Sequence, residues 1–571
     1  MNLIQIINNT LIINGNDLYI RKTNIGKFGI CEIPNEELEI YVKNCILDIY
    51  IHINFSSTHK QILHLQNKKS FIIESEGKKY KVWFCKILYN DDNNYELIKT
   101  VNIIYGRCES SMMFLDKLYR DYVQKYKFKI GDVIGIKSVA GSGKTTTLLN
   151  LAKTHKDKKI LYIAFNKSLI IEIKDKIRKE CITNLYPQTF DALARMVYLY
   201  RNKISSDDFG LFELKPQNLG MIIPWFLNKP YKIKNYFVKN YVNFCNQSKY
   251  NNMNDYCKNV LGGEKKMLNT MWAKSLDGDL VTFDTIRKMA EINHYCCDYL
   301  DSLYDMIFID ESQDFDNVML KILLDDTTIP KLFVGDPKQA IYEWKGCINA
   351  FDKLPKESLI IEFYSTFRVG NPACSEISSK FMNCHMISKS MNNTVLEYNV
   401  VPLEHEKYVY LFRSWRNLLQ NAQYLNKIWI NNFDAQITYM KRLHERLKIS
   451  NLDEDELGEF SDDLPKFLLK LSAEELDKLI NDIQKNIVVH DECLIEIYTI
   501  HTYKGLESNI VRIYNDIQLP KEENLYYVAL TRGKERIILD TVKDNCILYE
   551  DKNGNKKQKK MTHYGVGAII L

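Results

Sequence analysis

The chain has 571 residues, of which 46% are hydrophobic and 26% are charged, so it is long enough to form several globular domains. Its 77 Lys and Arg nearly balance its 72 Asp and Glu, and the formal net charge of +5 neither requires nor excludes a nucleic-acid partner. Any basic binding surface must therefore be local.

The cysteines and apolar runs exclude several classes of protein. The 14 cysteines are scattered, and none forms a CxxC pair or a Cys/His cluster with zinc spacing, so we expect free thiols in a reducing compartment. No run approaches the roughly 18 apolar residues of a membrane span, and the first residues lack the basic start of a signal peptide. These features predict an intracellular, soluble protein without a membrane partner.

Residues 1–104 show short alternating apolar runs such as "ILDIYIHINF", in which Ile49, Ile51 and Ile53 fall on one face of a strand. The pattern predicts a small β-rich domain. It carries no recognisable catalytic or metal-binding constellation. We interpret residues 1–104 as a surface for a protein partner.

Residues 105–350 alternate apolar strands with helical stretches, which predicts a lobe built on a parallel sheet. Its expected strands are "VIGIKSVA", "KILYIAFN", "LYDMIFIDE" and "KLFVGD". A helical insertion rich in Tyr, Lys and Asn interrupts the lobe at about 200–300, and in it Ile233 and Phe237 lie four apart, as a core-facing stripe would. The interleaved Lys and aromatic residues fit two interpretations, a solvated amphipathic helix or a surface that binds single-stranded nucleic acid.

Residues 351–548 repeat the α/β pattern, with expected strands "YVYLFRSW", "CLIEIYTIH", "NIVRIYN" and "ERIILD". A second helical insertion is expected at about 425–490, where Ser472 and Glu475 have the spacing of a capping box. Residues 549–571 form a basic polar tail. The predicted fold class is α/β, with two parallel-sheet lobes, helical insertions and a small β-rich N-terminal domain.

The segment "SVAGSGKTTT", residues 138–147, lies between an expected strand and a helix that begins near Lys144. Glycines let backbone N–H groups surround a phosphate, Lys144 adds positive charge, and Thr145 can ligate Mg²⁺. Ser138 stands where the general phosphate-loop pattern has its first Gly, but the strand-loop-helix context supports the assignment. The predicted nucleotide-binding set is Ala140, Gly141, Ser142, Gly143, Lys144, Thr145 and Thr146.

An acidic pair, Asp310 and Glu311, follows the apolar run "MIFI". Asp310 is suited to hold Mg²⁺ and Glu311 to polarise the attacking water, while Gln313 adds an amide near the γ-phosphate. Arg368 and Arg532 follow apolar stretches of the second α/β unit and can neutralise the transferred phosphoryl group if the two lobes face each other across the nucleotide. The residues therefore predict an ATP hydrolase.

Eight segments occur in one order: "AGSGKT", "IAFNKS", "TFDALA", "DESQD", "GDPKQAIYEWKG", "STFRVG", "TIHTYKGLE" and "LYYVALTR". Their series resembles the superfamily 1 helicases of the UvrD/Rep type, and it is most similar to the F-box DNA helicases and their viral relatives. The resemblance runs from near 105 to near 545. It implies two RecA-like lobes, ATP and Mg²⁺ as cofactors, and a DNA helicase that moves 3′ to 5′ on single-stranded DNA and unwinds tailed duplexes during replication, repair or recombination.

The same resemblance implies roles around ATP. Gln339 would act in catalysis by reading the γ-phosphate, with Glu311, Arg368 and Arg532 as the other catalytic residues. The nucleoside would be contacted by Phe367 on the adenine ring, by Glu507 on the ribose, and by Gln124 as an upstream adenine reader.

The family also implies contacts along a single strand. Aromatic stacking tolerates any base sequence, which suits a motor that steps along DNA. Two positions depart from the family pattern, because Asp191 replaces His and Lys345 replaces Arg. The residues expected to contact DNA are Phe165, Asn166, Thr189, Tyr342, Trp344 and His501.

Two alternatives stay open beside the DNA helicase. One is a helicase of the same superfamily that acts on RNA or an RNA/DNA hybrid, because the sequence does not indicate whether the substrate carries 2′-hydroxyl groups. The other is a translocase that removes proteins from single-stranded DNA without unwinding. A small-molecule kinase or a transporter ATPase would leave Tyr342, Trp344 and His501 unexplained.

Overall fold

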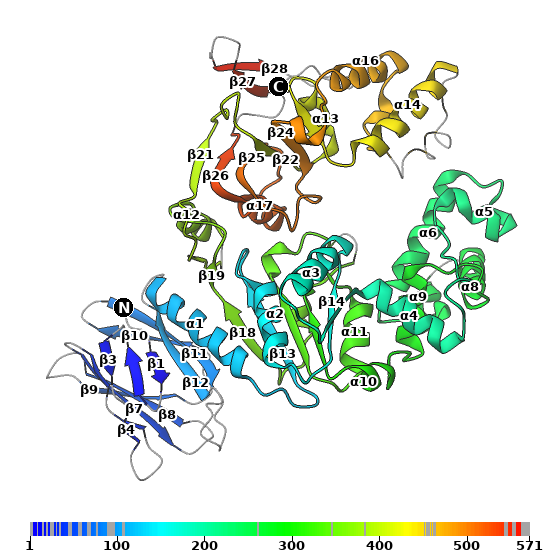
Figure 1. Cartoon of the computed structure of the whole chain (residues 1–571). Coiled ribbons are helices and arrows are strands. Elements are labelled where there is room, and N and C mark those ends of the chain that lie inside the picture. The colour runs from blue at the N-terminus through cyan, green and yellow to red at the C-terminus, as the bar shows by residue number, and fades with distance from the viewer. Residues whose placement is uncertain are drawn as a thin grey trace. The chain divides into compact units, whose positions relative to one another are not determined.

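The computed structural model describes side chains between residues 116 and 541, except at 118, 259–261, 344–345, 382–383, 450–451, 453–456, 458–459 and 461–463. Trp344 and Lys345 therefore lie outside the described residues. Beyond 116–541, only the course of helices and strands is described (Figure 1). The chain divides into two units, 1–125 and 126–571, which we describe separately.

The N-terminal unit is rich in antiparallel strands, as predicted. Its larger sheets have the orders β6-β7-β8-β9 and β10-β11-β12, and β8 contains the alternating run noted in the sequence, whose side chains lie outside the description. The elements are β1 (Ile4–Ile7), β2 (Thr10–Ile13), β3 (Asn16–Leu18), β4 (Arg21–Lys22), β5 (Phe28–Gly29), β6 (Cys31–Ile33), β7 (Glu36–Lys43), β8 (Asp48–Asn54), β9 (Lys60–Leu65), β10 (Ser70–Ser75), β11 (Lys78–Ile87), β12 (Ile98–Ile104) and α1 (Glu109–Lys125).

The first lobe is built on a six-stranded sheet of order β15-β14-β16-β17-β13-β18, in which all neighbours are parallel. Its strands are β13 (Val133–Ser138), β14 (Ile160–Ala164), β15 (Leu185–Thr189), β16 (Met306–Ile309), β17 (Lys331–Gly335) and β18 (Leu359–Phe363). Parallel strands place their carboxyl ends at one edge, where ligands of α/β folds bind. The last strand lies beyond residue 350, where the sequence analysis ended this lobe.

Helices connect these strands, as parallel pairing requires. The connecting elements are α2 (Lys144–Thr154), α3 (Lys167–Lys179), α4 (Phe190–Asn202), η4 (Ser312–Asp314), α11 (Asn317–Asp325), η5 (Pro337–Gln339) and η7 (Ala350–Asp352). Leu161, Ile163, Phe190 and Phe333 belong to one buried core that joins the sheet to α4 and α11. This core fixes the strand ends that carry the candidate site.

The predicted helical insertion of the first lobe is present and has a core of its own. It comprises η1 (Pro216–Asn218), α5 (Leu219–Ile222), η2 (Pro224–Phe226), α6 (Tyr231–Cys245), α7 (Met253–Tyr256), η3 (Cys257–Asn259), α8 (Gly262–Leu276), α9 (Phe283–Ile292) and α10 (Tyr299–Leu303). The expected stripe on α6 is wrong at Ile233, which is 39% exposed, whereas Phe237 is buried. The helix packs instead through Phe237, Tyr241 and Phe244.

The second lobe has another parallel sheet, of order β21-β26-β25-β22-β24-β23. Its elements are β19 (Ser365–Thr366), α12 (Ala373–Lys380), β20 (Ile387–Ser388), β21 (Val395–Tyr398), β22 (Tyr408–Phe412), α13 (Trp415–Ala422), β23 (Ile428–Ile430), α14 (Phe433–Ile449), η8 (Leu468–Lys470), α16 (Ala473–Gln484), η9 (His490–Glu492), β24 (Ile495–Thr499), β25 (Ser508–Ile513), α17 (Glu523–Leu530) and β26 (Gly533–Leu539). The two sheets confirm the predicted α/β class with two parallel-sheet lobes.

The second insertion begins α16 with the capping box that the sequence predicts. The backbone N–H of Ser472 donates to Glu475 Oε2 at 2.9 Å, and the N–H of Glu475 donates to Ser472 Oγ at 3.2 Å. Leu476, Leu479 and Ile483 are buried behind it. Farther on, β27 (Cys546–Glu550), where the basic tail begins, pairs antiparallel with β28 (Lys556–Lys560) of that tail.

The described cysteines are free thiols. A search of the helices in the described part of the chain finds none that is both long and apolar enough to cross a membrane.

Candidate functional site

The phosphate loop joins β13 to α2 at the carboxyl edge of the first sheet. Its glycines have left-handed backbone angles, with φ of 68° at Gly141 and 76° at Gly143, which residues with a Cβ adopt only with strain. Ser138, which replaces the usual first glycine, donates from Oγ to the carbonyl oxygen of Gly335 at 3.0 Å. The substitution therefore ties the loop to β17 and keeps the strand-loop-helix geometry.

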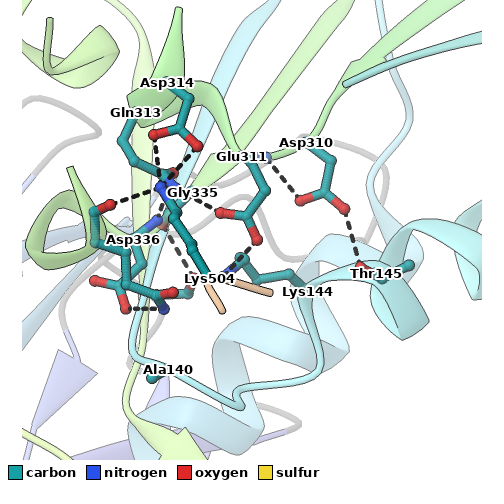
Figure 2. Close-up of polar contacts among 12 residues, drawn as sticks. Ala140, Lys144, Thr145, Asp310, Glu311, Gln313, Asp314, Gly335, Asp336 and Lys504 are labelled. Atoms are coloured by element: carbon teal, nitrogen blue, oxygen red, sulfur yellow. Dashed lines mark hydrogen bonds and ion pairs between the residues drawn. The ribbon is translucent and has the colours of Figure 1, made fainter. Parts of the chain in front are cut away.

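Asp310 is fully buried at the end of β16 and accepts three hydrogen bonds. They come from Thr145 Oγ1 at 2.9 Å, from Tyr162 OH at 2.6 Å and from the backbone N–H of Glu311 at 2.9 Å. Burial and the neighbouring Glu311 raise the pKa of Asp310. Figure 2 shows Thr145 and Asp310 facing each other beside Lys144.

These groups suit Mg²⁺, which takes oxygen ligands from hydroxyls and carboxylates and keeps several waters. Thr145 Oγ1 and Asp310 Oδ2 already lie together, so the two residues would hold the ion. Bound there, Mg²⁺ would offset negative charge on the phosphates. Lys144 is buried next to the same point, and its pKa is raised because Glu311 and Asp336 outweigh its loss of solvent.

Glu311 is held by contacts on both carboxylate oxygens. Lys144 Nζ lies 3.4 Å from Oε1, and Gln313 Nε2 donates to Oε2. Burial opposes ionisation, but Lys144 and Lys504 lower the pKa of this carboxyl to about 2. Glu311 is therefore an ionised acceptor beside the phosphate-loop lysine, and its predicted role in polarising water requires the ionised form.

Tyr162 is a residue of this site that the sequence analysis missed. It lies in β14, is fully buried, and donates to the same Asp310 oxygen as Thr145. Burial and Asp310 raise its pKa, so the phenol stays protonated and can donate. The only signal in the sequence is a polar hydroxyl inside the otherwise aliphatic run "KILYIA".

We expect Tyr162→Phe to weaken metal binding while leaving the fold intact. Without the phenol, Asp310 loses a hydrogen bond that orients its carboxylate, and changes to such supporting groups typically cost 10–100-fold in metal affinity. The Mg²⁺ concentration that half-saturates binding of a fluorescent ATP analogue should rise by roughly that factor. Tyr241→Phe is the control, because Tyr241 is also buried and hydrogen-bonded but lies in the insertion. Equal Mg²⁺ dependence in both variants would contradict the expectation.

Gln339 and Arg532 meet across the two lobes. Gln339 Nε2 donates to Asp336 Oδ2 at 2.7 Å, and its Oε1 accepts from Arg532 Nη2 at 2.8 Å. Burial and Arg368 lower the pKa of Arg532 to about 9, so this guanidinium lies where added negative charge would be stabilising. A phosphate bound at the loop would supply such charge.

Arg368, Glu507 and Phe367 lie around the same loop. Arg368 Nε donates to Glu507 Oε2 at 2.5 Å, and Lys534 Nζ lies 2.7 Å from Glu507 Oε1. The backbone N–H of Phe367 donates to the carbonyl of Gly141 at 2.8 Å, while its side chain is 51% exposed. The side chain predicted to contact the adenine ring is therefore about half exposed. Gln124 belongs to α1 in the other unit, and its role stays a prediction.

Lys504 is the second residue missed from the sequence. Its Nζ lies 2.6 and 2.7 Å from the two Asp314 carboxylate oxygens and donates to the carbonyl of Gln339 at 2.7 Å. The same ammonium lies 4.9 Å from the centroid of the Tyr342 ring. It therefore joins the second lobe to the acidic segment and to the loop after β17, as Figure 2 shows for Asp314.

We expect Lys504→Met to destabilise the protein by roughly 3–5 kcal/mol, because it leaves the buried Asp314 carboxylate without its cation. Burial, opposed by Lys504, raises the pKa of Asp314 to about 6. Asp314 is therefore charged at about pH 8 and mostly neutral at about pH 5, so the loss should be larger at the higher pH. Urea unfolding at both values measures it. Lys534→Met, which removes a half-buried partner of Glu507, is the control.

Three of the predicted DNA contacts lie together. The rings of Phe165 and Tyr342 are 6.3 Å apart, those of Tyr342 and His501 are 6.2 Å apart, and Tyr342 OH donates to the carbonyl of His501 at 3.1 Å. Asn166 starts α3 without using its side chain as a cap. Thr189 caps α4, where its Oγ1 accepts from the N–H of Ala192 at 3.1 Å, so its hydroxyl already has a structural role.

A cavity of about 1240 Å³ opens beside His501. Side chains from the segment after β22, from the second insertion and from the start of α17 line it together with the loop after β17. The sequence analysis missed most of them, although basic and aromatic residues directly after a strand, in "FRSWRN", are a signal. The basic and aromatic lining residues are Arg413, Trp415, Arg416, Lys466, Phe467, His501 and Lys521.

Asp191, the first departure from the family pattern, pairs with the buried Arg287 of α9. Arg287 also pairs with Asp284, and its Nε lies 3.8 Å from Asp316 Oδ2. The position where relatives have His therefore carries an ion pair between α4 and the insertion.

Residues 123–357 match the family model described as the UvrD/REP helicase N-terminal domain. The chain is 23% identical over 500 residues to F-box DNA helicase 1 of Gallus gallus, a match that covers 73% of this chain and 48% of that protein. It is 23% identical over 506 residues to F-box DNA helicase protein 1 of Schizosaccharomyces pombe, covering 72% and 56%.

Gabija protein GajB of Bacillus cereus is 26% identical over 322 residues, which are 42% of this chain and 64% of that protein. The chain spans about half the length of the F-box DNA helicases that it matches. These matches agree with the eight ordered segments and with the phosphate loop and acidic pair that the structure brings together. Residues 123–357 therefore match the UvrD/REP helicase family, and the chain as a whole is similar to UvrD-like superfamily 1 helicases.

Proposed function

We propose that the chain is an ATP-dependent DNA helicase that moves 3′ to 5′ along single-stranded DNA. The observation that carries this proposal is the position of Lys504, which contacts both the acidic segment of the nucleotide site and the Tyr342 ring. One side chain of the second lobe thus touches groups expected to face ATP and groups expected to face bases. A change at either site must disturb the same contacts.

In this proposal, Lys144 and the loop glycines bind the phosphates, and Glu311 polarises the attacking water. Arg368 and Arg532 reach the phosphoryl group from the second lobe, and Gln339 relays its presence to Arg532 through the 2.8 Å hydrogen bond. The nucleoside would lie against Phe367, with Glu507 and Gln124 as further contacts.

The bases would stack against Phe165, Tyr342, Trp344 and His501. The cavity beside His501 supports this path, because it combines Arg413, Arg416 and Lys466 for phosphates with an aromatic ring for a base. Residues 1–104 remain a proposed surface for a protein partner. ATP binding would tighten the contacts between the lobes and hydrolysis would release them, which moves the strand through the path.

The test measures ATP turnover and strand separation on duplexes with a 3′ tail or a 5′ tail, with Lys144→Ala as the inactive control. Unwinding of the 3′-tailed duplex alone supports the proposal, and preference for the 5′ tail overturns its direction. ATP turnover without strand separation would indicate a translocase that displaces proteins. Stronger stimulation by poly(U) than by poly(dT) would indicate an RNA substrate.

A further inference from the structure

Helices α5, α6 and α8 of the insertion lie close together (Figure 1). Large apolar side chains are exposed on α5, on α6 and in the segment 224–227 between them. We call this surface the α5–α6 face. Exposed fractions of 39–77% are unusual for such side chains because burial of apolar area is the main force of folding. The face consists of Met221 (77%), Trp225 (45%), Leu227 (61%), Ile233 (39%) and Tyr236 (40%).

The aromatic residues of the face are held in fixed orientations. The Trp225 ring lies perpendicular to the buried rings of Phe226 and Phe237, with centroids 5.0 and 5.8 Å away. Tyr236 lies against Phe237 as well, and its OH donates to Glu264 at 2.9 Å. A rigid aromatic ring with a free face loses little entropy when another planar group stacks on it.

The charged residues in the sequence around the exposed rings are lysines, although Glu264 of α8 contacts Tyr236 at the face. Residues 214–254 contain no Asp or Glu but include lysines on both sides of the exposed rings. Lys229 Nζ lies 4.5 Å from the centroid of the Trp225 ring. Lys232 and Lys239 are exposed on α6 and form no ion pair with any described residue. The face is thus locally rich in lysine, although the formal net charge of the whole chain is only +5.

We propose that the α5–α6 face binds an unpaired nucleic-acid strand at a second site, separate from the path at Tyr342 and His501. Positive side chains beside exposed aromatic rings are the composition of surfaces that bind single strands without sequence preference. A duplex presents phosphates but keeps its bases stacked inside, so Trp225 and Tyr236 would gain nothing from it. An acidic protein segment would meet the lysines but would not require the partly exposed rings of Trp225 and Tyr236.

This inference rests on the proposed function, because it supposes that the chain works on nucleic acid. A second site would hold the strand while the ATP-linked contacts release it. The second site would therefore strengthen binding only of strands long enough to reach both sites. Short strands would bind with the same affinity whether or not the second site is intact.

The experiment compares the full chain with Trp225→Ala and Lys232→Ala by fluorescence anisotropy, using oligo(dT) of about 10 and about 40 nucleotides. Each variant should bind the long strand roughly 5- to 30-fold more weakly. Lys232→Ala should also lower the salt dependence of binding. ATP turnover stimulated by the short strand should be unchanged, which shows that the variants are folded. Tyr200→Ala and Lys174→Ala, exposed elsewhere in the first lobe, are the matched controls.

Wild-type affinity for the long strand in both variants would overturn the inference, and so would a loss confined to blunt duplex DNA. If the wild-type chain bound neither strand and its ATP turnover ignored both, the proposed function itself would fail. The two failures are therefore distinguishable, since the first leaves DNA-stimulated ATP turnover in place.

Discussion

Replacing Glu311 with Gln is expected to lower ATP turnover by roughly 10²–10⁴-fold, the usual contribution of a general base. The amide has the same shape but cannot accept the proton of the attacking water. Binding of ATP should persist, because Lys144 and the loop backbone remain. Steady-state ATP hydrolysis and equilibrium binding of a fluorescent ATP analogue measure the two effects separately.

The control for Glu311→Gln is Lys144→Ala, which should lose nucleotide binding as well as turnover. Glu311 lies 3.4 Å from Lys144, so the amide also removes a charge partner, and a modest gain in affinity for the polyanionic nucleotide is expected. Turnover within a few-fold of the wild-type value would show that another group polarises the water.

Replacing Arg532 with Lys is expected to reduce ATP turnover by about 10³–10⁵-fold, the range measured for arginine fingers. Lysine keeps a charge but not the planar fork, so it cannot contact Gln339 and a phosphoryl oxygen together. Arg532 is 1% exposed, and burial and Arg368 lower its pKa to about 9, so the surroundings disfavour a cation, and lysine, whose intrinsic pKa is lower than that of arginine, would lose its charge there more readily.

Arg536→Lys serves as the control, because Arg536 lies four residues on and pairs with Glu397 and Glu406 away from the nucleotide site. Single-turnover hydrolysis distinguishes a slow chemical step from slow product release. If both variants lost turnover equally, the effect of Arg532 would be structural rather than catalytic.

The long buried strands were predictable because each is a continuous apolar run that ends in a polar motif. "MIFI" before Asp310 and "KLFVG" before Asp336 are examples. Strands β15 and β23 escaped prediction for physical reasons. The first, "LYPQT", contains Pro and two polar residues at a sheet edge, and the second has only three residues, Ile428–Ile430. Edge position relaxes the demand for apolar residues on both faces.

The site was predictable where its chemistry is local in the chain, as at Lys144 and Thr145. Tyr162 and Lys504 were not, because their roles arise from residues far away in sequence. Tyr162 meets Asp310 across neighbouring strands, and Lys504 meets Asp314 across the lobes. No spacing rule connects such pairs, and only their burial in three dimensions makes them partners.

Gly141 has a consequence for mutational scans of this chain. A Cβ built there would lie 2.6 Å from the Cβ of Arg368 and 2.9 Å from Thr366 Oγ1, which belong to the segment that opens the second lobe. An alanine at this position would therefore push the segment with Thr366 and Arg368 away from the phosphate loop, in addition to straining the turn. Its inactivity would report mechanical separation of Arg368 from the loop, and a loss of ATP turnover in that variant should not be attributed to phosphate binding alone.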